Sequence, residues 1–473
     1  MNMTKIKFGT DGWRAIIAQD YTTENVARVS EAVSIWLNSK YKNPSVVIGH
    51  DCRFAGSLFV ETATQVLIQN GIKVITTDKG FVSTPMISLA TAELKANLGI
   101  VITASHNPPS YNGYKLKGHF GGPLSPTEVD EIEKMIPDMA NQSYLQVSLK
   151  EAQQKALLVY EDLETMYVNK AASVFDLELI KKHNASLAYD AMYGAGQNAL
   201  KRLLPDITFL HCEYNPSFHG QAPEPIDKNL REFSKLISGN EKIKCGLATD
   251  GDADRIGLYN SKGEFVDSHH IILLTIHYLV KYKELKGKVV TGFSSTPRIK
   301  KLCAYYGLEH CEVPIGFKYI AGMMADPKED VLIGGEESGG IALKTHIPER
   351  DGIWMGLTIW EFMAKTGKSL EELIAEVYEL VGAFAFERND MHLNENKKQD
   401  IIAACKKGSF TSFGKYKVSA TENMDGFKYI FDENRWLMIR PSGTEPVLRT
   451  YAEAPTLTEV REILDVCKQT IGA

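Results

Sequence analysis

Segments patterned as helices and as buried strands alternate along most of this 473-residue chain, and this alternation restricts the fold more than any other feature. In the first third, apolar residues at helical spacing take turns with short continuous apolar runs. The expected elements are helices over 22–38, 58–70 and 85–96 and strands over 45–51, 72–78 and 98–103. A β-α-β-α-β order implies a mostly parallel sheet whose faces are covered by helices.

The same order restarts twice further along the chain. The second run has expected strands over 185–194, 207–215 and 245–250 with a helix near 196–204. The third run has expected strands over 288–293, 308–314 and 331–335 with helices near 297–306 and 317–325. Starting points more than about 100 residues apart indicate repeated domains rather than a short-period solenoid.

The last segment has a different pattern, which predicts a smaller α+β domain. WLMIRPSGTEPVLRTYAEA (436–454) reads as two strands around a loop, and a helix is expected over 457–470. We therefore expect an α/β protein with three related mixed or parallel-sheet units and a smaller C-terminal α+β domain. The predicted domains are 1–150, 151–256, 257–374 and 375–473.

Charge and cysteine content exclude several classes of protein. The net charge of −6, from 53 basic and 59 acidic residues, disfavours a general nucleic-acid binder. Seven cysteines without a CxxC pair disfavour a disulfide framework or a zinc site and fit a reducing cytoplasm. No apolar leader and no stretch of about 18 apolar residues is present, so no membrane association is expected.

The strongest local motif is DGDADR, which follows the expected strand CGLAT. Asp250, Asp252 and Asp254 occupy alternate positions, so an extended chain would turn all three carboxylates to one side, and a modest curl would bring them onto one cation. Oxygen ligands suit Mg²⁺ or Mn²⁺ rather than zinc. An EF-hand loop is excluded because its sixth and twelfth places hold Arg255 and Ser261 instead of Gly and Glu. A solvated acidic turn is the alternative to a metal site.

Three further loops carry groups that could bind a sugar phosphate. RPSGTEP offers Arg440 with two hydroxyls and a glycine, a pattern that suits phosphate, although a plain Ser-Gly turn fits equally well. GEESGG could turn Glu336 and Ser338 toward sugar hydroxyls, or could be an acidic loop. FGTDGWR could bring Arg14 to a phosphate, or could be only a hairpin turn. The residues of RPSGTEP proposed for phosphate are Arg440, Ser442, Gly443 and Thr444.

The stretch TASHNPP places Ser105 directly after an expected buried strand. The Gly-x-Ser-x-Gly elbow of a serine hydrolase is absent, and the adjacent His106 need not face the hydroxyl. A phosphorylated Ser105 fits better, because its phosphate would supply an oxygen that three carboxylates leave open on a metal ion.

Taken in this order, FGTDGWR, TASHNP, DGDADR and RPSGTEP resemble the signatures of the α-D-phosphohexomutase superfamily, which includes phosphoglucomutases, phosphomannomutases and phosphoglucosamine mutases. The resemblance spans nearly the whole chain. It implies four domains around a central cleft and a reaction in which a hexose 1-phosphate and a hexose 6-phosphate interconvert through a hexose 1,6-bisphosphate. A small-molecule sugar phosphate is the implied partner, and a monomer or homodimer is expected.

The resemblance also implies roles for individual residues. Ser105 would be the phosphorylated residue and would bind Mg²⁺ together with the three aspartates. Arg14 and Lys115 match an acid–base and charge-stabilising pair, and we expect crowding and burial to lower the pKa of Lys115. The implied substrate contacts are Arg255, Lys318, Glu336, Ser338, Arg440, Ser442, Gly443 and Thr444.

The departures from the family pattern bear on the sugar. The dual-specificity branch resembles GEMSGH and the glucosamine branch GEQSGH, whereas this chain has GEESGG with Gly340 in place of histidine. Gly316-Phe317 stands where the dual-specificity branch commonly has Gly-His, and HIPERDGIW (346–354) looks more like phosphoglucomutases. We expect glucose phosphate first and mannose phosphate second. A phosphoglucosamine mutase, a metal-dependent sugar phosphatase and a non-catalytic sugar-phosphate binder are the alternatives.

Overall fold

The computed structural model describes residues 5–441 and 447–472. The chain divides into two compact units. The first consists of Met1–Val290 and Gly316–Ile374, and the second of Thr291–Ile315 and Ala375–Ala473. No helix within the described ranges is both long enough and apolar enough to cross a membrane.

A six-stranded sheet opens the first unit, in the order β1-β5-β4-β2-β3-β6. Its strands are β1 (Trp13–Ile16), β2 (Ser45–His50), β3 (Lys73–Thr76), β4 (Leu98–Ile102), β5 (Tyr111–Gly118) and β6 (Leu158–Tyr160). The strands β4, β2 and β3 run parallel, as predicted, and β6, which was not predicted, is parallel to β3, whereas β5 is antiparallel to β4 and to β1. The β4–β5 connection is therefore a short loop rather than a helical crossover.

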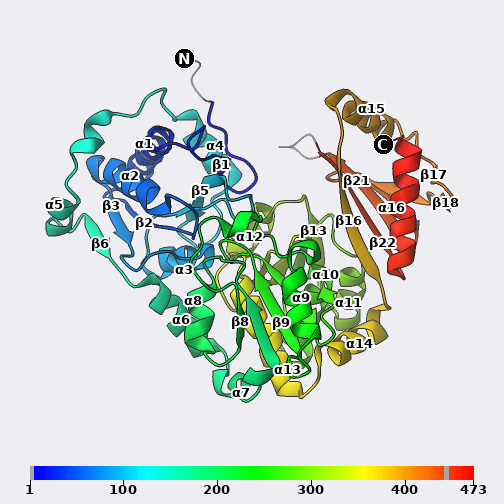
Figure 1. Ribbon diagram of the computed structural model, residues 1–473. Helices are drawn as coiled ribbons and strands as arrows, with labels where there is room; N and C mark the ends of the chain where they lie inside the picture. Colours follow the sequence, from blue (N-terminus) through cyan, green and yellow to red (C-terminus); the bar gives the residue numbers. More distant parts are fainter. Residues whose placement is uncertain (1–4, 442–446, 473) are drawn as a thin grey trace. The chain divides into compact units, whose positions relative to one another are not determined.

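Helices cover both faces of this sheet (Figure 1). They are α1 (Thr23–Lys40), α2 (Gly56–Gln69), α3 (Thr84–Glu93), α4 (Pro126–Lys134) and α5 (Leu149–Gln154). The buried residues of α1 and α2 share one core with Val46 and Ile48 of β2, whereas α3 contacts β2 and β4 from the other face. The hydroxyls of Thr22 and Ser83 cap α1 and α3 by accepting from backbone amides.

The second sheet of this unit has the order β11-β10-β9-β7-β8. Its strands are β7 (Leu187–Asp190), β8 (Thr208–Leu210), β9 (Cys245–Thr249), β10 (Ile256–Asn260) and β11 (Phe265–Val266). The helices α6 (Leu163–Val174) and α7 (Leu177–Lys181) precede β7, and α8 (Gln197–Leu203) and α9 (Arg231–Ser238) lie between the strands. The strands β8, β7 and β9 are parallel and β10 returns antiparallel, so the β9–β10 connection is again a tight loop.

The third α/β segment is shared between the two units. The first unit holds α10 (Ser268–His277), α12 (Phe317–Ala325), β14 (Val331–Gly335), β15 (Ile341–Leu343) and α13 (Gly352–Thr366). The strands β14 and β15 form an antiparallel hairpin. The second unit holds α11 (Arg298–Tyr306) and β13 (His310–Val313), and the division falls within β12 (Lys288–Gly292) and within α14 (Leu370–Val381).

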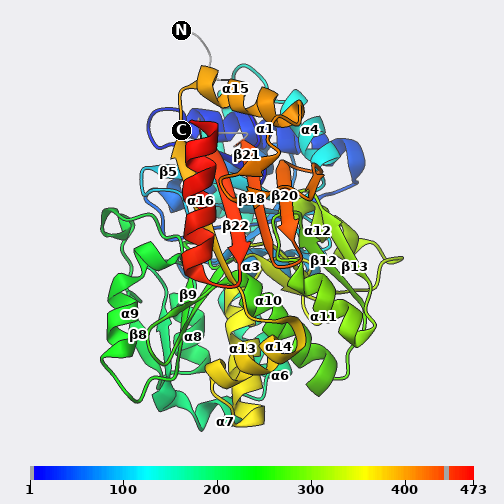
Figure 2. The same cartoon turned by 90° about the vertical axis from the view of Figure 1, so that its right-hand side faces the viewer.

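The second unit contains an antiparallel sheet in the order β16-β22-β21-β20-β19. The elements are β16 (Ala385–His392), α15 (Glu395–Lys406), β19 (Ala420–Glu422), β20 (Phe427–Asp432), β21 (Arg435–Pro441), β22 (Val447–Ala454) and α16 (Leu457–Ile471), with a small hairpin of β17 (Ser412–Phe413) and β18 (Tyr416–Lys417). Figure 2 shows α16 lying along β22, which it contacts. Two strands followed by a helix were predicted for this segment, and the prediction is confirmed.

Candidate active site

Ser105 lies in the loop between β4 and β5, at the carboxyl end of β4. Its backbone φ is 51°, in the left-handed region that residues other than glycine seldom adopt. The side chain is buried, and its hydroxyl donates a hydrogen bond of 2.6 Å to Oδ2 of Asp250. The nucleophile predicted from TASHNPP and the first carboxylate of DGDADR therefore meet directly.

Arg53 supports the strained Ser105 loop. Its guanidinium donates to the carbonyl oxygens of Ser105 and Asn107 at 2.6 Å each, and to those of Pro108 and Tyr111 at 2.9 Å each. The side chain is also paired with Asp51 at 3.3 Å, and neither side chain is exposed.

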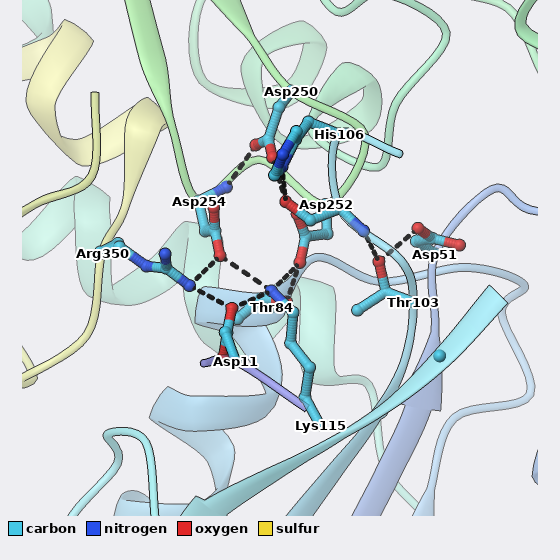
Figure 3. A network of polar contacts seen from close by, with 12 residues as sticks. Asp11, Asp51, Thr84, Thr103, His106, Lys115, Asp250, Asp252, Asp254 and Arg350 are labelled. Atoms are coloured by element: carbon cyan, nitrogen blue, oxygen red, sulfur yellow. Dashed lines mark hydrogen bonds and ion pairs between the residues drawn. The ribbon is translucent and has the colours of Figure 1, made fainter. Parts of the chain in front are cut away.

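A second chain of hydrogen bonds reaches Ser105 from Asp51. The hydroxyl of Thr103 donates to Asp51 and accepts the backbone N–H of Ser105 at 2.9 Å (Figure 3). Burial raises the pKa of Asp51 to about 6, although Arg53 opposes this shift. The conformation of the serine loop thus depends on a buried network that begins at Asp51, directly after the neighbouring strand β2.

Residues 250–255, which we call the metal loop, form a tight turn between β9 and β10. The backbone N–H groups of Asp254 and Arg255 donate to Oδ1 of Asp250 at 2.9 and 3.0 Å. The chain curls here as expected, and Ala253 at the turn has a left-handed φ of 58°. The turn brings one oxygen from each of Asp250, Asp252 and Asp254 within 4.8 Å of the others, and all three residues are buried.

The donor set of the metal loop fits a divalent cation. Oδ1 of Asp252 and Oδ1 of Asp254 are buried and have no hydrogen-bond partner. Buried carboxylate oxygens without partners are costly unless a cation offsets their charge. Burial, followed by the nearby Asp254 and Asp252, raises the pKa of Asp250 well above its ordinary value. An all-oxygen cluster of this kind suits Mg²⁺ or Mn²⁺.

Lys115, on β5, places its ammonium group among these carboxylates (Figure 3). Nζ lies 2.7 Å from Asp252, 3.0 Å from Asp254 and 2.8 Å from Asp11. Burial alone would lower the pKa of Lys115, but Asp11 and the two metal-loop carboxylates raise it above its ordinary value. The prediction of a lowered pKa is therefore wrong, because the sequence did not show that three acidic groups surround this lysine.

Arg350 is a second buried cation of the site. Its Nη2 donates to Oδ2 of Asp254 at 2.7 Å and also to Asp11. Asp11 thus bridges Lys115 and Arg350, and although burial opposes the shift, the two cations hold its pKa well below the ordinary value. The turn Thr10-Asp11 is closed by a hydrogen bond from Gly9 N–H to Gly12 C=O, so this segment forms a hairpin turn, and a binding role for it stays a prediction.

Arg14 lies beside the serine loop, and His106 is part of this loop. Nη1 of Arg14 donates to the side chain of Asn107 at 2.7 Å, and Nη2 lies 3.7 Å from Asp11. Nδ1 of His106 lies 3.4 Å from the Ser105 hydroxyl, which is closer than we expected for adjacent residues. Burial, together with the cations Arg255 and Arg14, lowers the pKa of His106 well below its ordinary value, so this imidazole is neutral at pH 7.

Residues 335–340, which we call the sugar loop, connect β14 to β15. Oε1 of Glu336 accepts the N–H of Gly316 at 2.9 Å, and burial, followed by Glu337, raises the pKa of Glu336 to about 7. Ser338 is half-buried in the same turn. Arg255 of the metal loop pairs with Gly340 in a β-bridge, and Lys318 lies on α12 with Nζ 5.3 Å from the Tyr319 ring centroid. The structure therefore brings the sugar loop against the metal loop.

The RPSGTEP motif belongs to the second unit. Arg440, at the end of β21, pairs with Asp425 at 3.2 Å. Ser442, Gly443 and Thr444, which we predicted to bind phosphate, lie outside the described residues.

Sequence reasoning missed several polar residues of the site, although most stand inside motifs that it had noted. Asp11 is in FGTDGWR, Arg350 is in HIPERDGIW, and Arg53 stands in GHDCRFAG (49–56), a further stretch that is similar to the family. Thr84, whose hydroxyl donates to Asp252, is the first residue of α3 and carries no local signal of this contact. Each of these roles depends on a contact between segments far apart in the chain, which a linear motif does not show.

Comparison with known families gives four consecutive matches along the chain. Residues 5–143, 165–263 and 267–381 match alpha/beta/alpha domains I, II and III of phosphoglucomutase/phosphomannomutase. Residues 394–468 match the C-terminal domain of the same family. The four domain ranges that we gave from the sequence differ from these matches at their edges and stay predictions.

Individual proteins give the same family. A crystal structure of a Thermus thermophilus protein, named provisionally as a phosphomannomutase, is 32% identical, covers 100% of both chains and has a TM-score of 0.87. A phosphoglucomutase/phosphomannomutase of Thermococcus kodakarensis is 29% identical over 97% of each chain. A phosphoglucosamine mutase of Carboxydothermus hydrogenoformans is 28% identical over 97% of each chain.

Proposed function

The chain belongs to the phosphoglucomutase/phosphomannomutase family and is a phosphohexomutase, and we propose that it moves a phosphoryl group between O1 and O6 of a hexose through Ser105. The observation that carries the proposal is the hydrogen bond of 2.6 Å from the Ser105 hydroxyl to Asp250 of the metal loop. It places a buried serine oxygen against three carboxylates suited to a divalent cation, which is the pairing that phosphoryl transfer requires.

We propose that Ser105 carries the phosphoryl group between two half-reactions. The Ser105 O–P bond breaks as the free hydroxyl of a hexose phosphate forms a new O–P bond, and the proton that this hydroxyl loses ends on the freed Ser105 oxygen. The product is a hexose 1,6-bisphosphate, which turns around in the site. Its other phosphoryl group then returns to Ser105, and the released sugar oxygen regains a proton. The reaction is an isomerisation, since no atom is gained or lost overall.

Asp250, Asp252 and Asp254 would hold Mg²⁺ together with an oxygen of the Ser105 phosphate. When bound, the ion would offset negative charge on the group being transferred. The two aspartate oxygens without partners support this assignment. Lys115 and Arg14 would add fixed positive charge near the transferring phosphoryl group, a task that suits cations held in place before the substrate arrives.

The remaining predicted contacts would bind the sugar phosphate itself. Glu336 and Ser338 would accept and donate hydrogen bonds to sugar hydroxyls. Arg255, with a buried Nε that has no hydrogen-bond partner, and Lys318 would contact phosphate or the rim of the site. The C-terminal motif would bind the phosphate that is not reacting, through Arg440, Ser442, Gly443 and Thr444.

We propose glucose phosphate as the preferred substrate and mannose phosphate as a second one. Two segments support this choice, because GEESGG departs from the patterns of the dual-specificity and glucosamine branches and HIPERDGIW looks more like phosphoglucomutases. The names of the related proteins include phosphoglucomutase/phosphomannomutase and phosphoglucosamine mutase, so glucosamine phosphate is the competing assignment.

A competitive substrate panel tests the proposal. Turnover of glucose 1-phosphate, mannose 1-phosphate and glucosamine 1-phosphate is measured with Mg²⁺ and a trace of the matching bisphosphate. We expect conversion to the 6-phosphate, with the highest kcat/KM for glucose. A higher kcat/KM for another sugar would overturn the substrate but not the class. Release of inorganic phosphate without isomerisation would identify a sugar phosphatase instead.

A further inference from the structure

Gly340 lies where the sugar loop meets the metal loop, and two kinds of contact fix it there. The backbone of Gly340 bridges to Arg255, and Ile256 N–H donates to Gly339 C=O at 3.1 Å. On its other side Gly340 faces the side chain of Arg350. A Cβ added at residue 340 would lie 3.0 Å from Cγ of Arg350 and closer still to its Cδ. Contacts this short between carbon atoms force one of the partners to move.

The side chain of Arg350 has little room to adopt another conformation. Its guanidinium reaches Asp254 at 2.7 Å and Asp11, and it lies 5.3 Å from the centroid of the Phe317 ring. The side chain is only 4% exposed.

The backbone on either side of Arg350 is fixed as well. Glu349 is paired with Lys117 at 2.7 Å. Asp351 caps α13 by accepting the N–H of Trp354 at 2.9 Å. The stem of Arg350 must therefore cross the sugar loop where residue 340 has no side chain.

We propose that Gly340 and Arg350 are a matched pair that positions the catalytic carboxylates. The missing side chain at residue 340 admits Arg350 to the site, and Arg350 then holds Asp254 of the metal loop and Asp11 of the first loop in one arrangement. Arg350 is a positioning residue that acts through these carboxylates. This inference rests on the proposed function of the same site. It adds the contacts through which Arg350 connects the sugar loop, the metal loop and the loop that contains Asp11.

The pair also explains why the sugar loop of this chain ends in glycine. The related patterns GEMSGH and GEQSGH end in histidine, whose Cβ and ring would occupy the space that the Arg350 stem fills here. A chain with histidine at this position needs a different path for the residue that corresponds to Arg350. Replacement of Gly340 should therefore be less harmful when Arg350 is replaced as well than when Arg350 is kept.

A double-mutant cycle tests the pair in the full-length protein. The variants are Gly340→Ala, Arg350→Ala and the two combined. The control is Gly322→Ala on α12, where an added Cβ meets nothing within 4 Å. Each protein is measured for kcat and KM with glucose 1-phosphate and, separately, for its urea unfolding midpoint, which does not depend on turnover.

Displacement of a fixed charge by about 1 Å can lower a rate on the order of a hundredfold. We expect Gly340→Ala to lower kcat by at least about tenfold and KM to change less. In the Arg350→Ala background the same glycine change should alter kcat by less than about twofold, because the clashing stem is gone. Gly340→Ala should likewise lower the unfolding midpoint of the unmodified chain but hardly change that of Arg350→Ala. Gly322→Ala should behave like the unmodified protein.

Three results would overturn the inference. One is additive effects of the two changes on both kcat and the unfolding midpoint. Another is a Gly340→Ala protein that matches Gly322→Ala. The third is a double variant that fails to fold although Arg350→Ala folds. If the unmodified chain turns over no sugar phosphate, the proposed function fails, while the unfolding midpoints still decide whether the pair exists.

Discussion

Removal of the Arg53 guanidinium should destabilise the first unit and disable the serine loop together. The change Arg53→Met keeps an apolar stem of similar length but removes every donor. Four carbonyl oxygens of the loop, those of Ser105, Asn107, Pro108 and Tyr111, each lose the hydrogen bond that Arg53 donates. The Asp51 carboxylate loses its only ion-pair partner among the described residues.

The size of the effect follows from the burial of this pair. Both side chains are 0% exposed, and breaking a fully buried ion pair costs about 3–5 kcal/mol of unfolding free energy. Protonation of Asp51, whose pKa burial already raises to about 6, limits the loss. The double variant Asp51→Asn/Arg53→Met should therefore be more stable than Arg53→Met alone, because it leaves no uncompensated carboxylate.

Urea unfolding at pH 7.5 measures the loss of stability, and turnover of glucose 1-phosphate measures the loss of function. Arg202→Met is the control, since Arg202 pairs with Glu164 at 2.9 Å but is 39% exposed and should contribute at most about 1 kcal/mol. Under conditions where Arg53→Met is still folded, we expect its kcat to be lower than that of the unmodified chain on the order of a hundredfold. An Arg53→Met protein as stable and active as Arg202→Met would refute the reasoning.

Three further predictions concern metal binding by the metal loop, the close contact between Gly251 and the backbone of Ser105, and the dependence of stability on pH. Asp252→Asn should weaken Mn²⁺ binding in calorimetry and lower turnover together, and full activity in chelator would exclude a metal role. Gly251→Ala should lower kcat, because a Cβ there would lie 2.6 Å from the Ser105 carbonyl oxygen; a kinetic match to the unmodified chain would contradict this. Burial, with Lys300 and Lys428, lowers the pKa of His310 to about 4. Unfolded histidine titrates near pH 6.5, so the folded state binds fewer protons between these values and stability should fall as pH drops from about 6.5 to about 4. His310→Asn should reduce that fall by at most about 3 kcal/mol in urea unfolding, and an unchanged pH profile would exclude His310 as its source.

The order of elements and the principal motifs were predictable because they depend on local pattern. Apolar periodicity gave the helices and strands, and TASHNPP and DGDADR stand at strand ends where a sheet presents its loops. The structure brings Ser105 and Asp250 into contact, although 145 positions separate them in the chain. The residue types were enough to predict this contact, since a phosphorylated hydroxyl and a set of carboxylates can bind the same cation.

Electrostatic detail was not predictable because it depends on which charges share a buried volume. Lys115 was expected to meet mainly Arg14, which would lower its pKa. The structure surrounds it with three carboxylates instead, one of them contributed by the first loop, and its pKa rises. Arg350 was noted only for its motif, since nothing in a linear sequence shows that its stem must cross a glycine about ten residues away in the chain.

The most direct test of the phosphoserine account is a single-turnover transfer experiment. The protein is incubated with ³²P-labelled glucose 1,6-bisphosphate, freed of small molecules, and mixed with unlabelled glucose 1-phosphate and Mg²⁺. The account predicts label on the Ser105 peptide before the chase and its transfer to the sugar at a rate no slower than kcat, with no label on a Ser105→Ala protein. Label on another residue, or turnover by Ser105→Ala near that of the unmodified chain, would contradict it.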